Sequence, residues 1–152
     1  MIFCIDFDGT VIEQPKSPGD PAEDMQLRPG AARVLLALRQ AGHILVLSSA
    51  RSNPAHRLDW RLNPLWTSGA VPFDERAWER SQPFWEAAHQ LMLKFIDTYL
   101  PDVFHAVDEG QQGKVVADVY LDDRGFRMGR RSWAEVEMLY AQTSKEKQRG
   151  QS

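Results

Sequence analysis

Two aspartates stand where the first apolar run of the chain ends. Asp6 and Asp8 follow apolar residues 2–5, and Gly9 directly after them permits a sharp turn. Side chains two apart on an extended strand share a face, so the two carboxylates are predicted to point the same way. Crowded carboxylates repel one another and lose hydration, a cost that a bound cation or a retained proton removes. The spacing indicates an acidic site at a strand end, with a plain Asp-Gly turn as the structural alternative.

Further polar residues stand at the ends of later apolar runs. They are Ser48 and Ser49, then Asp122 and Asp123, with Lys114 ahead of the last run. Several carboxylates without a histidine or thiol form a hard oxygen site that suits Mg²⁺. A lysine and a hydroxyl beside that cation suit a phosphate group, and a carboxylate can attack phosphorus to form an aspartyl-phosphate. The set therefore predicts a site for phosphoryl chemistry.

The elements that must position these residues alternate along the chain. Strands are predicted at 2–5, 43–47, 103–107 and 115–121, and each is nearly continuously apolar. Helices are predicted from Pro29 to a left-handed cap at Gly42, from Asn53 to about Leu62, from Ser81 and Pro83 to Tyr99, and from Ser132 through Tyr140. This pattern predicts an α/β fold with a mostly parallel sheet and helices on both faces. Ligands of such sheets bind beyond the carboxyl ends of the strands, where the polar residues fall.

Composition limits the classes of function. The 152 residues are 43% hydrophobic and 26% charged, which indicates one domain, assigned to residues 1–142, with a polar tail at 143–152. A net charge of -3 gives no electrostatic case for nucleic acid. The single cysteine, Cys4, lies in an apolar run and is predicted to be buried. The sequence shows neither a signal peptide nor a membrane span, so a cytoplasmic location and no membrane partner are expected.

The motifs resemble those of the haloacid dehalogenase (HAD) superfamily. Residues 6–10, Asp-Phe-Asp-Gly-Thr, look like its first motif, DxDGT. Residues 44–51 are similar to the second, an apolar strand that closes in Thr or Ser before an Arg, here Arg51. Lys114 and the run from 117 to 124 resemble the third and fourth motifs, a lysine and then a paired acidic site. The whole set looks especially like a subgroup of small, single-domain HAD hydrolases.

The resemblance implies a role for each residue. Asp6 is the expected nucleophile and a Mg²⁺ ligand, whereas Asp8 is the expected general acid and base and ligates the metal only through its backbone carbonyl. Phosphate binding is assigned to Ser49, preferred over Ser48, and to Lys114, Gly9 and Thr10. The second acid of the pair is usually the direct ligand, so Asp123 is preferred, with Asp122 beside it. Two departures are the serine in place of the commoner threonine and the absence of a proline after Lys114.

The spacing between motifs leaves no room for the cap domain that many members carry. Residues 53–81 form at most a small tryptophan-rich elaboration. An uncapped site suits a bulky substrate or a homo-oligomer whose neighbour closes it, and the elaboration is the candidate contact. The expected substrate is a small phosphorylated molecule. Two other functions stay open: an inactive phosphate-binding or scaffolding relative, and a receiver-type signalling domain that accepts a phosphoryl group on aspartate.

Overall fold

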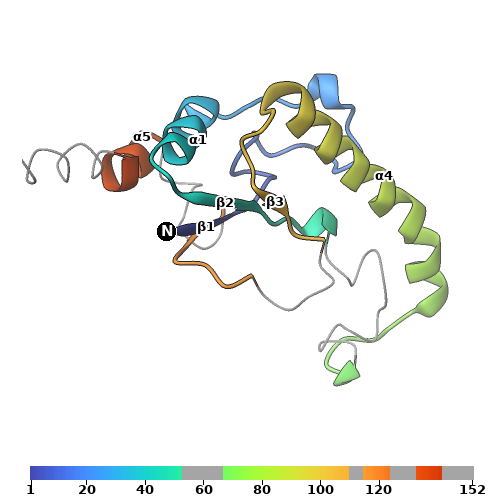
Figure 1. Cartoon of the computed structure of the whole chain (residues 1–152). Helices are drawn as coiled ribbons and strands as arrows, with labels where there is room; N and C mark the ends of the chain where they lie inside the picture. Colours follow the sequence, from blue (N-terminus) through green and yellow to red (C-terminus); the bar gives the residue numbers. More distant parts are fainter. Residues whose placement is uncertain (53–66, 110–114, 124–132, 142–152) are drawn as a thin grey trace, which may run out of the picture.

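One parallel sheet forms the centre of the protein (Figure 1). The computed structural model describes residues 1–52, 67–109, 115–123 and 133–141. The strands are β1 (Ile2–Ile5), β2 (Ile44–Leu47), β3 (Ala106–Val107) and β4 (Val119–Leu121), and their order in the sheet is β3-β2-β1-β4. Register pairs Phe3 with Leu45 on one side and with Val119 on the other. The fold is the predicted α/β, Rossmann-like class, and the described residues contain no cap domain.

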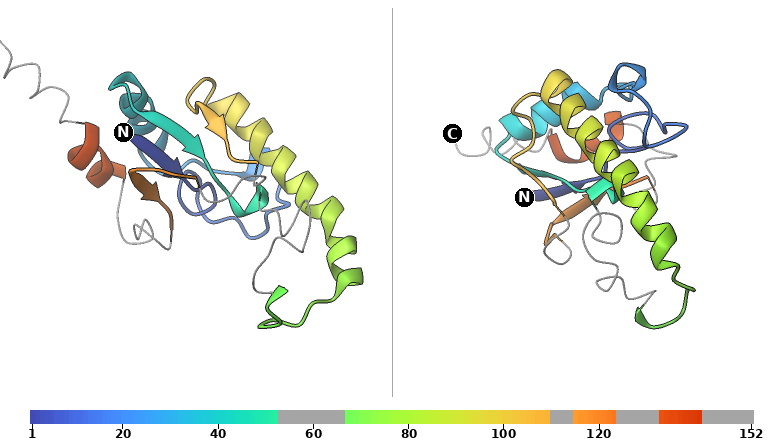
Figure 2. Two further views of the ribbon diagram at one scale, coloured as in Figure 1. Left: turned by 60° about the horizontal axis from the view of Figure 1, so that its bottom comes forward. Right: turned by 90° about the vertical axis from the view of Figure 1, so that its right-hand side faces the viewer.

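The hydrophobic core lies on one face of this sheet. Phe3 and Ile5 of β1 and their partners Leu45 and Leu47 of β2 are completely buried. Three helices pack on this face: α1 (Ala31–Gln40), the C-terminal half of α4 (Glu75–Tyr99) and α5 (Trp133–Val136) (Figure 2). A π-helical turn, Glu137–Ala141, continues α5, and short 3-10 turns occupy Ala22–Asp24 and Ala50–Ser52. The prediction of helices on both faces is not met in the described residues, because none of their helices covers the opposite face, where Ile44 is 44% exposed.

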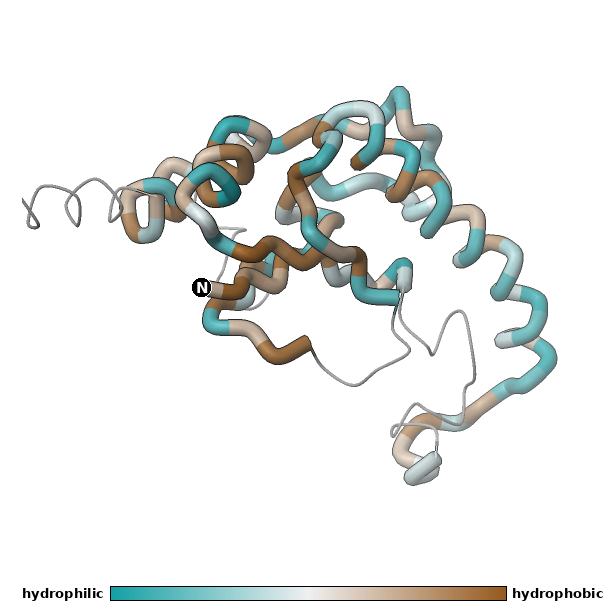
Figure 3. The backbone as a smooth tube through the Cα atoms, in the orientation of Figure 1, coloured by the Kyte–Doolittle hydropathy of each residue, from teal (hydrophilic) through white to brown (hydrophobic). Residues whose placement is uncertain are grey.

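The long helix α4 begins earlier than the sequence indicates. The predicted start at Ser81 and Pro83 is wrong, because Asp74 caps the helix by accepting a hydrogen bond from Ala77 N at 3.0 Å. Pro83 lies inside the helix, where its ring removes one backbone hydrogen bond. The N-terminal half of α4, residues 75–87, is hydrophilic in Figure 3 and contains no buried residue. Water can therefore bond to the carbonyl that Pro83 leaves without an amide partner. The three- and four-residue spacing of apolar residues puts Phe84 and Tyr99 on the apolar stripe of this helix, but their exposed fractions are 43% and 50%.

Other boundaries also differ from prediction. The third and fourth strands are shorter than 103–107 and 115–121, since β3 pairs with β2 at only two positions and Val116 is 85% exposed. The apolar spacing of the last helix puts Leu139 on its buried face, but Leu139 is 43% exposed. The helix predicted from Asn53 to Leu62, the cap residue Ser132 and most of the tryptophan-rich segment lie outside the described residues. Within the described ranges no helix has the length and apolar character needed to cross a bilayer.

Candidate metal and phosphate site

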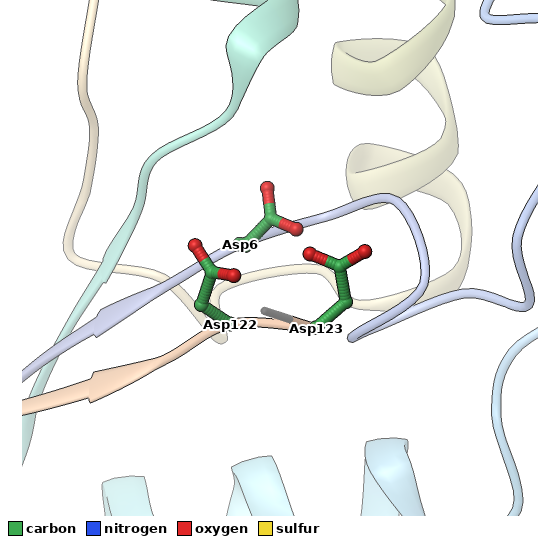
Figure 4. Close-up of side chains that lie close together, drawn as sticks. All are labelled: Asp6, Asp122 and Asp123. Carbon is green, nitrogen blue, oxygen red and sulfur yellow. The ribbon is translucent and has the colours of Figure 1, made fainter. Parts of the chain in front are cut away.

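Three carboxylates meet at the carboxyl edge of the sheet. Asp6 directly follows β1, while Asp122 and Asp123 directly follow β4. The two strands are hydrogen-bonded neighbours, and Asp6 N donates to Leu121 O at 2.9 Å, which fixes their ends side by side. One oxygen from each carboxylate lies within 4.8 Å of the others (Figure 4). The parallel pairing of β1 and β4 thus brings together acids from opposite ends of the chain.

The electrostatics of this cluster favour a cation. Burial raises the pKa of the Asp6 carboxyl from its ordinary value of 3.8 to about 7. The Phe7 amide opposes that shift by hydrogen bonding, whereas the nearby charges of Asp122, Asp8 and Asp123 add to it. A divalent ion among these oxygens would remove both the repulsion and much of the desolvation cost. The donor set is all carboxylate oxygen, which fits Mg²⁺ and does not fit a soft metal.

The turn after Asp6 requires a glycine. Gly9 has a positive φ of 74°, and a β-carbon there would lie 2.7 Å from Gln14 Oε1 and 3.2 Å from Asp123 Cβ. The carbonyl of Phe7 accepts from the amides of Thr10, Val11 and Ile12, which curls the chain tightly beneath the acidic cluster. The turn at Gly9 therefore lies directly against Asp123, and only a residue without a β-carbon fits there.

Thr10, predicted to bind phosphate, is completely buried. Its hydroxyl donates to Asp6 Oδ2 at 3.4 Å, and its carbonyl accepts from the indole of Trp133 at 2.9 Å. The neighbouring Gly9 carbonyl accepts from Arg28 Nη1 at 2.7 Å. In this structure the Thr10 side chain supports the Asp6 carboxylate, a role that the first motif alone does not reveal.

The Asp8 side chain lies outside the group of three carboxylates. Its two oxygens accept from Nε and Nη2 of Arg51 at 2.9 Å and 2.7 Å. Arg51 is completely buried, stacks over the Phe7 ring at 5.1 Å, and donates through Nη1 to the carbonyls of Pro18 and Ala88. An arginine at this place in the sequence could contact phosphate or pair with a carboxylate, and here it forms a salt bridge with Asp8. One guanidinium thereby joins Asp8, the loop segment at Pro18 and α4.

The two serines after β2 have different partners. Ser48 Oγ donates to Asp108 Oδ2 at 2.9 Å, which occupies its hydrogen. Ser49 is 8% exposed, and its Oγ accepts from Arg51 N at 3.2 Å. Its hydroxyl hydrogen is used in no contact among the described residues, so Ser49 is the better donor for an anion. Lys114, the remaining predicted phosphate ligand, lies outside the described residues.

Sequence analysis did not identify three residues that support the site through hydrogen bonds, because none of them belongs to a motif. Asp108 accepts from Ser48, and Arg28 donates to the carbonyl of Gly9. His89, which has the sequence context of an ordinary helix residue, contacts Ser52 in the turn after the second motif. The one available signal was the pair of acids Asp108 and Glu109 directly after an apolar run. Acids at that position share the sheet edge with the other strand ends.

Comparison with known proteins supports the fold. No family model matches the chain, and no curated protein matches it. The structure is similar to that of a conserved protein coded by a locus from Bacteroides thetaiotaomicron. The TM-score is 0.52 at 22% sequence identity, over 91% of this chain and 88% of the other. At that identity the likeness shows a shared fold.

Proposed function

We propose that this protein is a Mg²⁺-dependent phosphomonoester hydrolase that acts through an aspartyl-phosphate on Asp6. The observation that carries the proposal is the half-buried Asp6 carboxylate directly after β1, with oxygens of Asp122 and Asp123 within 4.8 Å. Ser49 follows the adjacent strand β2 at the same edge. The resemblance of these segments to the HAD motifs supports the same reaction, in the cytoplasm and on a small phosphorylated substrate.

The reaction divides into two displacements at phosphorus. An Asp6 oxygen attacks the phosphorus, its new P–O bond forms as the ester P–O bond breaks, and the Asp8 carboxylic acid protonates the departing alkoxide. Asp8, now a carboxylate, then removes a proton from water, whose oxygen attacks phosphorus. The bond to Asp6 breaks, and inorganic phosphate leaves. Because Arg51 holds both Asp8 oxygens, this cycle requires Asp8 to release at least one of them to the substrate.

The other groups bind and orient the phosphate. Asp6, Asp122 and Asp123 would hold Mg²⁺, which when bound neutralises phosphate charge and the repulsion among the three acids. The Ser49 hydroxyl and the Lys114 ammonium would bind phosphate oxygens. Ser49 and the three carboxylates follow neighbouring strands at one edge of the sheet, and that arrangement fits one small tetrahedral group.

A second candidate is a phosphate-binding relative without catalytic turnover. The bidentate Asp8–Arg51 pair favours it, since the pair occupies both oxygens of the proposed acid and base. Such a protein would still bind Mg²⁺ and phosphate at the same edge. The two functions differ in whether Asp8 leaves Arg51 during a reaction.

The test is hydrolysis of a panel of phosphate esters in Mg²⁺ or in EDTA. We expect wild-type hydrolysis only with Mg²⁺, none with Asp6→Asn, and full activity for the control Asp97→Asn, an exposed carboxylate on α4. Unchanged hydrolysis by Asp6→Asn would overturn the nucleophile assignment. No turnover by the wild type on any ester, together with measurable phosphate binding, would favour the second candidate.

An activated ester tests Asp8 separately. The 4-nitrophenolate group leaves without a proton, so Asp8→Asn should still form the aspartyl-phosphate but hydrolyse it slowly. We expect a burst of nitrophenolate equal to the enzyme concentration, followed by turnover on the order of 100-fold slower than wild type. Steady turnover at the wild-type rate without a burst would contradict the proposed role of Asp8.

A further inference from the structure

A buried histidine outside the proposed chemistry contacts the turn after β2. His89 of α4 is 1% exposed, and its Nδ1 lies 2.8 Å from Ser52 Oγ. On the other side of the ring, Nε2 lies 3.4 Å from Glu109 Oε2. A buried imidazole with a partner at each nitrogen holds its neighbours in a defined arrangement. The proposed reaction gives His89 no task, so its contacts need another explanation.

The set of serine, histidine and glutamate is not a hydrolytic triad. Ser52 is 1% exposed, so its hydroxyl is closed off from a substrate. A nucleophile must reach the atom it attacks, and this hydroxyl is enclosed between the turn and α4. The contact between Ser52 and His89 is therefore a support.

The supported turn carries the proposed phosphate hydroxyl. Ser52 N donates to Ser49 O at 2.9 Å, and Arg51 N donates to Ser49 Oγ at 3.2 Å, so the position of Ser49 depends on where Ser52 is held. The opposite end of the turn is also held, because Ser48 donates to Asp108. Asp108 and its neighbour Glu109 thus secure both ends, directly at Ser48 and through His89 at Ser52.

We infer that His89 is a positioning residue that holds the Ser48–Ser52 turn so that Ser49 meets the substrate phosphate. This inference rests on the proposed function for the identity of the anion. Ser49 binds phosphate in the substrate and in the transition state alike, so loosening the turn weakens both. The signature is a higher KM with an unchanged kcat. A variant that merely reduces the folded fraction lowers the apparent kcat and leaves KM as it was.

The experiment compares His89→Leu, His89→Asn and Ser52→Ala. Leucine removes both polar contacts, whereas the asparagine amide oxygen takes the place of Nδ1 and accepts from Ser52. Ser52→Ala removes the same contact from the other side with little change in volume, which guards against misfolding of the leucine variant. We expect His89→Leu and Ser52→Ala each to raise KM and the inhibition constant of inorganic phosphate about tenfold. His89→Asn should stay within about threefold of wild type, and the double variant should add little to either single one.

Two results overturn the inference: a fall in kcat with KM unchanged, or an asparagine variant no better than the leucine variant. A second measurement separates this inference from the proposed function. Hydrogen exchange of the Arg51 and Ser52 amides, which bond to Ser49, should quicken in His89→Leu and return toward wild type in His89→Asn. If no ester is hydrolysed but exchange follows that order, the proposed function fails and the positioning role stands. Equal exchange in all variants refutes the positioning role whatever the activity.

Discussion

Replacing Asp6 by Asn should stabilise the metal-free protein at high pH. The folded state keeps a proton on Asp6 up to about pH 7, whereas the unfolded chain releases it near pH 3.8. Between those values the folded state binds more protons, so the unfolding free energy falls as pH rises, by about 1.4 kcal/mol per pH unit. This contribution is fully present below about pH 4 and is lost as pH passes 7. Asparagine carries no charge and removes the penalty.

The size of the effect follows from the interval between the two pKa values. The full cost of ionising Asp6 in the folded state is about 4 kcal/mol, and about 3 kcal/mol of it develops between pH 5 and pH 8. The stability difference between Asp6→Asn and wild type should therefore grow by about 3 kcal/mol over that range. Urea unfolding in EDTA at both pH values measures it, with Asp97→Asn as the control carboxylate.

Magnesium provides the second half of this test. Mg²⁺ that binds only the folded state should stabilise the wild type at pH 8, increasingly with concentration, and should leave Asp6→Asn nearly unaffected. If the difference in unfolding free energy between Asp6→Asn and the wild type is the same at pH 5 and pH 8, the argument that burial and neighbouring acids raise the pKa of Asp6 is refuted. The same pH dependence in Asp97→Asn would show that the effect does not belong to this site.

Three further predictions concern the same edge of the sheet. Arg51→Met should lower the unfolding free energy by about 3–5 kcal/mol in urea titrations, because it leaves Asp8 without its buried partner; a loss below 1 kcal/mol would contradict this. Gly9→Ala should cost about 1–2 kcal/mol and weaken Mg²⁺ binding, since its β-carbon would press on Asp123 at 3.2 Å; unchanged calorimetric affinity would count against that contact. Asp123→Asn should abolish thermal stabilisation by Mg²⁺ while Asp97→Asn keeps it, and equal stabilisation of both would exclude Asp123 as a ligand.

The sequence was most informative where apolar runs end in polar residues. The apolar runs at 2–5 and 43–47 predicted two strands of a parallel sheet. Because ligand sites of such sheets lie beyond the carboxyl ends of the strands, the same reasoning placed Asp6 with Asp122 and Asp123. The ends of helices and strands were less predictable, because they depend on contacts that a local sequence pattern does not contain. The helix α4 begins before Pro83 because Asp74 caps it and solvent surrounds its N-terminal half.

The surroundings of Asp8 could not be read from the sequence. Alternation along a strand predicts only the initial direction of a side chain, and the chain leaves strand geometry after Ile5. The partner of Asp8 is Arg51, whose own position depends on the carbonyls of Pro18 and Ala88 in distant segments. Such a contact requires the tertiary structure, as does the burial of Thr10 beneath Trp133.

The pairing of β1 with β4 has a consequence for biosynthesis. The strand β1 is synthesised before β2, α4 and β3, whereas its partner at 119–121 and the indole of Trp133 follow all of them. Local contacts between β1, α1 and β2 can form before then, whereas the acidic cluster is a contact of high sequence separation and closes late. A nascent chain therefore carries Asp6 without Asp122 and Asp123, and the cluster proposed to hold Mg²⁺ can form only after β4 has been synthesised.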